Sequence, residues 1–271
     1  MDGLIANAFR NSRQYEMAAK AYEEAANCHV AVNSLFLAAK ALETAGNLLS
    51  QQASKPQEAV VMFQKASDYF VAQGSGDRGG EMLEKAARAV ESNVDQALEL
   101  YCTSCDVFEQ EDKLKFGVDV YKKAIAFAVR SNRMEKAILL SDRLEKAFIK
   151  IGNIPYAQRQ ALTNVVILLG TMKHNEAQTK FEASSQLSNG FTQSADGRAA
   201  SDLLTAFQTG DKELYAETIK SNAIRFLDND VAKLAKSIQI HDKPAIQAVE
   251  NVESSQQVKK LQDEIEEEGF L

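Results

Sequence analysis

The sequence predicts an all-α protein built from repeated pairs of antiparallel helices. Two observations carry this prediction. Apolar residues recur with the 3.6-residue period of a helix, strand-like alternation is missing, and the chain has only three prolines. The same helical pattern also returns about every 40 residues, which is the length of a helix-turn-helix repeat. The expected fold class is therefore an α-solenoid, in which helical hairpins stack side by side.

The segment from Glu58 to Phe70 holds the clearest copy of the repeat. Its apolar positions share one face of a helix, where small alanines let a neighbouring helix approach and rings fill the remaining space. These positions are Ala59, Phe63, Ala66 and Phe70. The first of them recurs in steps of 38 to 41 residues, at Ala18, Ala59, Ala97, Ala137 and Ala177.

The residue four positions after each of these alanines is aromatic in four of five cases. The aromatic residues are Tyr22, Phe63, Tyr101 and Phe181, and the exception is Ser141. This alanine-aromatic-small spacing resembles the second helix of tetratricopeptide repeats. The resemblance implies a tetratricopeptide-like, right-handed α-solenoid of antiparallel helix pairs, and a set of unrelated amphipathic helices is the alternative.

Start and stop signals predict the individual helices. Pro56 suits the first turn of a helix, which tolerates a missing N–H group. Asp77, Asp95 and Asp211 suit N-cap positions, and Gly210 is a stop signal. The array is expected to contain helices at 15–29, 35–45, 56–73, 77–91, 95–108, 113–129, 133–151, 155–170 and 175–187. The helix at 113–129 is expected to bury Phe116, Val120, Ala124 and Phe127.

The repeat fades after residue 187, and this change predicts two parts. Residues 1–190 are expected to form the repeated array, and residues 191–271 a second helical part with an acidic tail. Segment 188–197 is rich in Ser, Asn, Gly and Gln and is the expected loop. The second part is expected to contain helices at 199–209, 211–219, 226–238 and 246–268.

The composition predicts a cytoplasmic protein. Hydrophobic residues make up 45% and charged residues 25% of the 271 positions, which is ordinary for a globular chain. The longest strongly apolar run, residues 165–169, is too short to cross a bilayer, and no secretory leader opens the chain. Cys28, Cys102 and Cys105 are an odd number, which argues against a disulfide framework.

The charge is concentrated at two poles. The net charge is −7, and −5 of it belongs to Asp263, Glu264, Glu266, Glu267 and Glu268 near the C-terminus. Between residues 113 and 136 the sign reverses, with seven basic residues against two acidic ones. Two opposed poles suggest two partners.

No residue pattern predicts catalysis, a metal site or a cofactor. Cys102 and Cys105 form a C-x-x-C pair, but nothing nearby completes a zinc site, so buried thiols are expected. Gly74-x-Gly76-x-x-Gly79 has the spacing of a dinucleotide fingerprint but lacks the preceding strand that this motif requires. An acidic chain without an aromatic platform does not favour nucleic-acid binding, and no small-molecule substrate is indicated.

Four segments resemble the soluble NSF attachment proteins (SNAPs; NSF is the N-ethylmaleimide-sensitive factor). They are LFLAAKALETAGNLL (35–49), EAVVMFQKASDYFVAQG (58–74), NVDQALELY (93–101) and FLDNDVAKLAKSI (226–238). The last is the most discriminating, and the later half of the chain resembles the gamma type. The similarity covers nearly the whole chain, which is expected to start after the N-terminal helix and membrane-inserting apolar loop that are usual in this family.

The resemblance implies a non-enzymatic adaptor: a twisted sheet of helices capped by a C-terminal helical bundle. Family members bind the assembled four-helix bundle of SNARE proteins, including syntaxin, and recruit the hexameric AAA+ ATPase NSF, which pulls the bundle apart. The implied role is vesicle-mediated protein transport, including transport between endoplasmic reticulum and Golgi, and membrane fusion. The implied location is peripheral, on the cytosolic face of secretory and vacuolar membranes through partners. A generic tetratricopeptide-type peptide-binding scaffold is the alternative.

The resemblance also implies two sets of binding residues. A SNARE bundle has an acidic surface, so the basic residues of the array are candidates for binding it. They are Lys40, Lys85, Lys113, Lys115, Lys122, Lys123, Arg130 and Arg133, of which Lys40, Lys85 and Lys123 are expected to form a ladder across the repeats. The candidates for binding and stimulating the ATPase are Glu264, Glu266, Glu267, Glu268 and Leu271. A solvated basic face and a frayed, solubilising tail are the alternatives.

Overall fold

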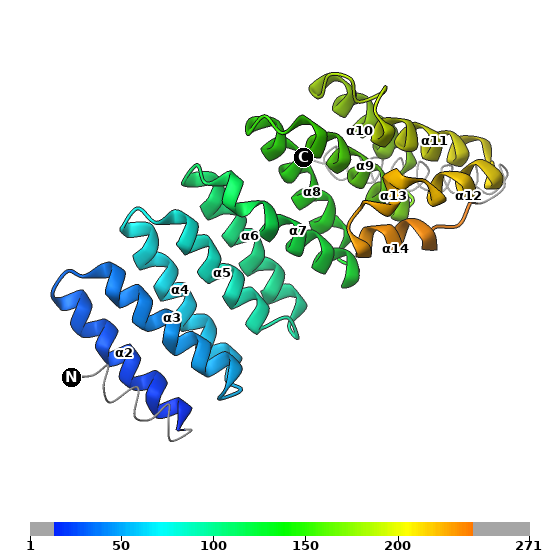
Figure 1. The fold of residues 1–271 in the computed structure, drawn as a ribbon. Helices are drawn as coiled ribbons and strands as arrows, with labels where there is room; N and C mark the ends of the chain where they lie inside the picture. The colour runs from blue at the N-terminus through cyan, green and yellow to red at the C-terminus, as the bar shows by residue number, and fades with distance from the viewer. Residues whose placement is uncertain (1–13, 241–271) are drawn as a thin grey trace, which may run out of the picture. The chain divides into compact units, whose positions relative to one another are not determined.

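The computed structural model describes residues 14–240, which form thirteen α-helices and no strand (Figure 1). The helices are α2 (Tyr15–Ala31), α3 (Leu35–Gln51), α4 (Pro56–Ala72), α5 (Gly76–Ala89), α6 (Val94–Gln110), α7 (Leu114–Arg130), α8 (Met134–Lys150), α9 (Ile154–Gly170), α10 (His174–Leu187), α11 (Ala195–Thr209), α12 (Lys212–Lys220), α13 (Asn222–Arg225) and α14 (Asn229–Ser237). The predicted all-α fold class is confirmed. The helix expected at 246–268 lies outside the described residues. No described helix is both long enough and apolar enough to span a bilayer.

The chain divides into two compact units between Ala157 and Gln158. The first unit contains α2 to α8 and the first residues of α9. The second contains the rest of α9 and α10 to α14. The predicted boundary at residues 190 and 191 stays a prediction.

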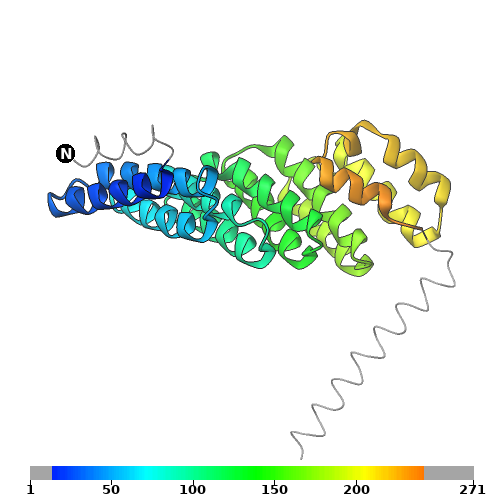
Figure 2. The same ribbon diagram turned by 90° about the horizontal axis from the view of Figure 1, so that it is seen from below.

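In the first unit, each helix from α2 to α8 packs against the next one along the chain (Figure 1, Figure 2). Alternate helices also touch. Lys65 of α4 binds Glu23 of α2 at 2.8 Å, and Arg143 of α8 binds Asp106 of α6 at 2.6 Å. Helices α2, α4, α6 and α8 therefore form one layer, here called the even layer. Helices α3, α5, α7 and the start of α9 form the other, here called the odd layer.

The turns that lead from the even layer to the odd layer share one backbone shape. Each contains one residue with a positive φ angle: Asn33 (56°), Gly74 (78°), Asp112 (53°) and Gly152 (76°). The next residue donates its N–H to a carbonyl five positions earlier, as Ser75 does to Phe70 at 2.8 Å. Glycine, asparagine and aspartate adopt this left-handed shape at low cost. The turns therefore repeat with the same period as the helices.

The predicted anchor alanines and the phenylalanine rings of α4 lie in the core. All five alanines of the 40-residue series have no exposed area, and Ala66, Phe63 and Phe70 of α4 are 0–1% exposed. The Phe63 ring lies against α3, because a Cβ atom at Gly46 would be 2.7 Å from it. The predicted apolar face of α4 is confirmed.

Phe63→Ala is expected to lower the free energy of unfolding by about 3 to 5 kcal/mol, because it removes a buried ring and leaves a cavity between α3 and α4. Urea unfolding followed by circular dichroism measures this loss. Val61→Ala is the matched control on the same helix, since Val61 is 45% exposed, and it is expected to change stability by less than about 0.5 kcal/mol. Equal effects of the two substitutions would contradict the assignment of the core.

The predicted inner face of α7 is wrong at one residue. Val120, Ala124 and Phe127 are buried as predicted, whereas Phe116 is 64% exposed. Gly117 faces inward in its place, against Phe108 of α6, and a Cβ atom at Gly117 would lie 2.8 Å from that side chain. Close packing of α6 on this glycine rotates α7 so that Phe116 points outward.

The predicted helix caps are correct in one case and wrong in two. Asp211 caps α12 and accepts hydrogen bonds from the N–H groups of its first turn, and Gly210 ends α11 with φ 73°. Asp77 and Asp95 do not cap, because α5 and α6 begin earlier, after Ser75 and Asn93. Both aspartates lie in a first turn instead, where a negative charge is favourable for the helix dipole.

In the second unit, α11 packs against α10, α12 and α13. Phe207 of α11 contacts the rings of His174 and Tyr215, with centroids 4.9 and 5.7 Å apart. The Tyr215 hydroxyl donates to the carbonyl of Ala235 in α14. These contacts join α14, which contains most of the discriminating segment 226–238, to the core of this unit.

Candidate functional site: the exposed face of helix α7

The exposed residues of α7 gather on one side of the helix. Lys115, Phe116, Asp119, Lys122 and Lys123 are exposed, and their spacings of three, four and seven residues put them on one face. We call these five residues the α7 face. It combines three cations with one carboxylate and one large apolar ring.

Ion pairs link successive helices of the odd layer. Lys85 Nζ of α5 donates to Glu43 Oε1 of α3 at 2.6 Å. Lys123 Nζ of α7 donates to Glu84 Oε1 of α5 at 2.9 Å. The partners are 42 and 39 residues apart, or one repeat. Lys40 also binds Glu43, at 2.7 Å. Each lysine of the expected ladder thus binds a carboxylate of the odd layer.

The pattern of these pairs changes at α7. Glu43 and Glu84 occupy the ninth position of α3 and α5, and Lys122 occupies the ninth position of α7. Lys122 Nζ lies 5.4 Å from the centre of the Tyr156 ring, at the start of α9. A cation–π contact holds the ammonium group but does not neutralise it. The charge of Lys122 is therefore not balanced by an acid within residues 14–240.

The eight predicted basic residues differ in their pairing. Within residues 14–240, Lys113, Lys115 and Lys122 make no ion pair. The other five bind acids: Lys40 and Lys85 bind Glu43, Lys123 binds Glu84, Arg130 lies 3.9 Å from Glu91, and Arg133 lies 2.9 Å from Asp95. The structure brings Lys115, Lys122 and Lys123 together on the α7 face. It places Lys40 on α3, Lys85 on α5, and Arg133 beside α6.

The Glu43 pair makes stability depend on pH. Burial acts to raise the pKa of Glu43, but hydrogen bonds from Lys40 and Lys85 outweigh it and hold the pKa below its ordinary value. A lowered folded-state pKa stabilises the fold above the unfolded-state pKa of about 4.3, and this stabilisation is lost as pH falls through the folded-state pKa.

Glu43→Gln is therefore expected to lower the free energy of unfolding by about 0.5 to 1 kcal/mol at pH 7. The difference from wild type should shrink as the pH falls through the lowered folded-state pKa of Glu43, because the carboxylate then becomes neutral. Urea unfolding of both proteins at a series of pH values from 7 downward measures this difference. Glu81→Gln, at an exposed position of α5, is the control. A difference that stays constant with pH would show that the carboxylate charge is not its source.

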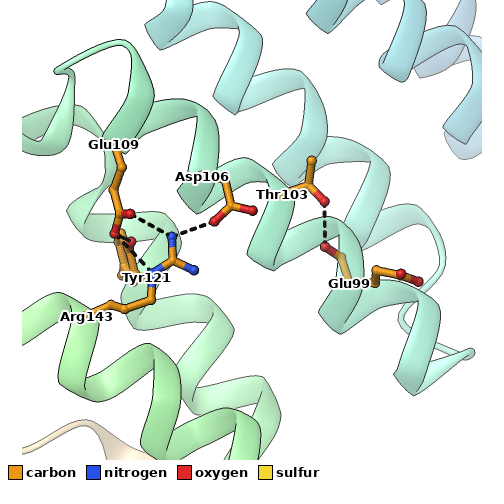
Figure 3. A network of polar contacts seen from close by, with 6 residues as sticks. All are labelled: Glu99, Thr103, Asp106, Glu109, Tyr121 and Arg143. Carbon is orange, nitrogen blue, oxygen red and sulfur yellow. Dashed lines mark hydrogen bonds and ion pairs between the residues drawn. The ribbon is translucent and has the colours of Figure 1, made fainter.

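Arg143 of α8 fixes the orientation of α7 from the even layer (Figure 3). Its guanidinium binds Asp106 and Glu109 of α6 at 2.6 and 3.0 Å, and lies 5.5 Å from the Tyr121 ring of α7. The Tyr121 hydroxyl donates to Glu109. Burial opposes ionisation of Glu109, but the hydrogen bonds from Arg143 and Tyr121 lower its pKa below the ordinary value. This network joins three helices and leaves the α7 face directed outward.

The predicted buried thiols are only partly confirmed. Cys105 is fully buried, and burial raises the pKa of its thiol. Cys102 is half-buried, and burial raises its thiol pKa as well. Both are free thiols. Among residues 14–240, no group of three or more histidine, cysteine, aspartate or glutamate side chains is arranged as metal ligands would be.

Sequence reasoning missed the acidic partners Glu43 and Glu84 and the exposed rings of Phe116 and Tyr156. Aligning the segments that form the odd-layer helices α3, α5 and α7 would have revealed the shared ninth position and the change from glutamate to Lys122. The same alignment places Phe116 and Tyr156 at the third position of α7 and α9. The predicted ATPase-binding residues, Glu264, Glu266, Glu267, Glu268 and Leu271, lie outside the described residues.

Helical hairpins in register with an exposed charged face define an all-α helical repeat protein. Residues 5–241 match the family model described as soluble NSF attachment protein, SNAP. The chain belongs to the soluble NSF attachment protein family, whose members are adaptors and not enzymes.

Individual relatives agree with this assignment. The chain is 30% identical over 243 residues to a gamma-soluble NSF attachment protein of Arabidopsis thaliana, covering 89% of this chain and 83% of the relative. It is 25% identical over 236 residues to a gamma-soluble NSF attachment protein of Dictyostelium discoideum, covering 87% and 72%. A beta-soluble NSF attachment protein of Bos taurus is 22% identical over 242 residues, covering 86% and 80%.

Proposed function

We propose that this protein is an adaptor that binds an assembled SNARE four-helix bundle, including syntaxin, through the α7 face. The observation that carries this proposal is the presence on the α7 face of two lysines without an acidic partner in the described chain, Lys115 and Lys122. Unpaired ammonium groups on one face attract an acidic surface and orient it. The odd layer before α7 offers less free charge, because Lys40 of α3 and Lys85 of α5 both bind Glu43.

The acidic C-terminal end is proposed to attach NSF. The relatives are described as NSF attachment proteins, and the segment from Asp263 to Glu268 holds five of the chain's acidic residues. A basic face and an acidic end of the same chain suit two partners of opposite charge. ATP hydrolysis by NSF then pulls apart the SNARE bundle that the α7 face holds.

This role places the protein on membranes through its partners. We propose a cytoplasmic adaptor that associates peripherally with the cytosolic face of secretory and vacuolar membranes. Its proposed task is SNARE complex disassembly in vesicle-mediated protein transport, which includes endoplasmic reticulum to Golgi transport, and in membrane fusion. The proposed organisation has two parts. Residues 1–190 form a helical array, and residues 191–271 form a C-terminal bundle with an acidic tail.

A reconstituted disassembly reaction tests the proposal. Purified protein, NSF and an assembled SNARE complex are incubated with ATP or with a non-hydrolysable analogue, and separation of the SNARE chains is followed by fluorescence. Disassembly is expected only with all three components and hydrolysable ATP. A complex that stays assembled with all components present, while an authentic alpha-type adaptor dissociates it, would refute the proposed function.

A hollow in the even layer favours a second candidate, the peptide-binding scaffold. This hollow of about 490 Å³ lies between α6 and α8. Leu98 and Met134 line it together with charged residues of both signs, among them the ion pair of Asp95 and Arg133. A scaffold of this kind should bind short isolated peptides, whereas the adaptor should prefer a folded bundle. Fluorescence anisotropy with a SNARE-motif peptide and with the assembled complex separates the two.

A further inference from the structure

Two exposed aromatic side chains accompany the free lysines of α7. Phe116 is 64% exposed and directly follows Lys115. Tyr156 is 46% exposed and lies against Lys122. Large aromatic residues exposed beside cations are characteristic of binding surfaces, because a partner that covers them gains apolar burial and charge contacts together.

These rings belong to a row that crosses the odd layer. Leu37, Phe116 and Tyr156 are the third residues of α3, α7 and α9, and Leu37 is 48% exposed. The third residue of α5 is Arg78, whose guanidinium lies 5.4 Å from the Phe36 ring. One end of each odd-layer helix therefore carries an apolar side chain or a cation. A partner that touches several members of this row must be elongated and lie across the helices.

We propose that Phe116 and Tyr156 are the apolar anchors by which the α7 face holds its partner, a rod of packed helices with apolar side chains exposed between its carboxylates. This inference rests on the proposed function and adds the apolar part of the recognition. The charge of Lys113, Lys115 and Lys122 selects an acidic partner, and the two rings select one with apolar groups beside the acids.

The lysines and the rings act at different stages of binding. Long-range attraction by Lys115 and Lys122 speeds the first encounter and is screened by salt. Contact with the rings forms only after docking and is insensitive to salt. Loss of the rings therefore changes the dissociation rate, whereas loss of the lysines changes mainly the association rate. This difference allows the two contributions to be measured separately.

The experiment measures binding kinetics on an immobilised, assembled SNARE complex at several salt concentrations. Phe116→Ala, Tyr156→Ala and the double variant are compared with Val61→Ala combined with Leu139→Ala, two exposed apolar residues of the even layer. The double ring variant is expected to dissociate at least about tenfold faster, with an association rate within about twofold of wild type. The Phe116→Tyr and Tyr156→Phe variants, which keep the rings, should retain slow dissociation.

The outcomes distinguish failure of the anchor proposal from failure of the proposed function. If wild type binds and the double ring variant dissociates no faster than the even-layer control, the anchor proposal is overturned and the proposed function stands. A change confined to association also overturns it. If wild type does not bind the complex, the proposed function fails first. Circular dichroism melting checks the fold, and because Tyr156 also packs on Phe148 with ring centroids 5.5 Å apart, Phe116→Ala alone keeps the test valid if the double variant is unstable.

Discussion

Lys115→Glu combined with Lys122→Glu is expected to weaken binding to an assembled SNARE complex about 100-fold at low salt. Both lysines lie on the α7 face without an acidic partner in the described chain. Reversing them replaces two attractions by two repulsions with an acidic surface, and steered association can change by factors of 10 to 1,000. The salt dependence of the association rate should become shallower or reverse its sign. Surface plasmon resonance at low and physiological salt measures both quantities.

The matched control changes the net charge equally on the other layer. Lys20→Glu combined with Lys146→Glu reverses two exposed lysines of α2 and α8, and is expected to weaken binding only slightly through the net charge. If this control weakens binding as much as the α7 variant, overall charge and not the α7 face governs recognition. If neither variant matters at low salt, the basic pole is only a solvated surface.

Deletion of residues 266–271 is expected to abolish stimulation of NSF while leaving SNARE binding intact. The deleted segment carries Glu266, Glu267, Glu268 and Leu271, which are proposed to meet the ATPase. The α7 face lies in the first compact unit and keeps all its residues, so binding to the SNARE complex should not change. ATPase rate and SNARE disassembly are measured in parallel with the binding assay.

Two further variants separate charge from the apolar end in this deletion. Changing Glu264, Glu266, Glu267 and Glu268 to glutamine removes the charge, and Leu271→Ala removes the terminal side chain. Stimulation that survives the complete deletion would remove this segment from the mechanism. Together, the lysine and deletion variants should fail in complementary ways: the first keeps contact with NSF, and the second keeps contact with the SNARE complex.

The inter-repeat ion pairs explain why the lysines of α3, α5 and α7 differ in how much free charge they offer. Lys85 and Lys123 each neutralise a glutamate of the preceding repeat. Lys122, at the ninth position of α7, contacts the ring of Tyr156 instead of an acid. Pairing of lysine with glutamate thus stabilises the contact between α3 and α5. At the ninth position of α7, lysine replaces glutamate, and this lysine has no acidic partner in the described chain.

The sequence by itself determined the all-α class, the 40-residue period and the buried anchors. Ala59, Phe63 and their equivalents could be recognised because the helical period and the repeat length are local properties of the chain. Burial follows directly from that pattern: the anchor alanines have no exposed area.

Only the tertiary structure decided which charges are free and which rings are exposed. Glu84 is 39 residues from Lys123 in the sequence, so no short-range pattern predicts that the two side chains pair. Phe116 fits the helical period of a buried residue, yet the contact of Gly117 with Phe108 turns it outward. Rotation of a helix about its axis depends on the side chains of neighbouring helices, and the composition of the α7 face follows from that rotation.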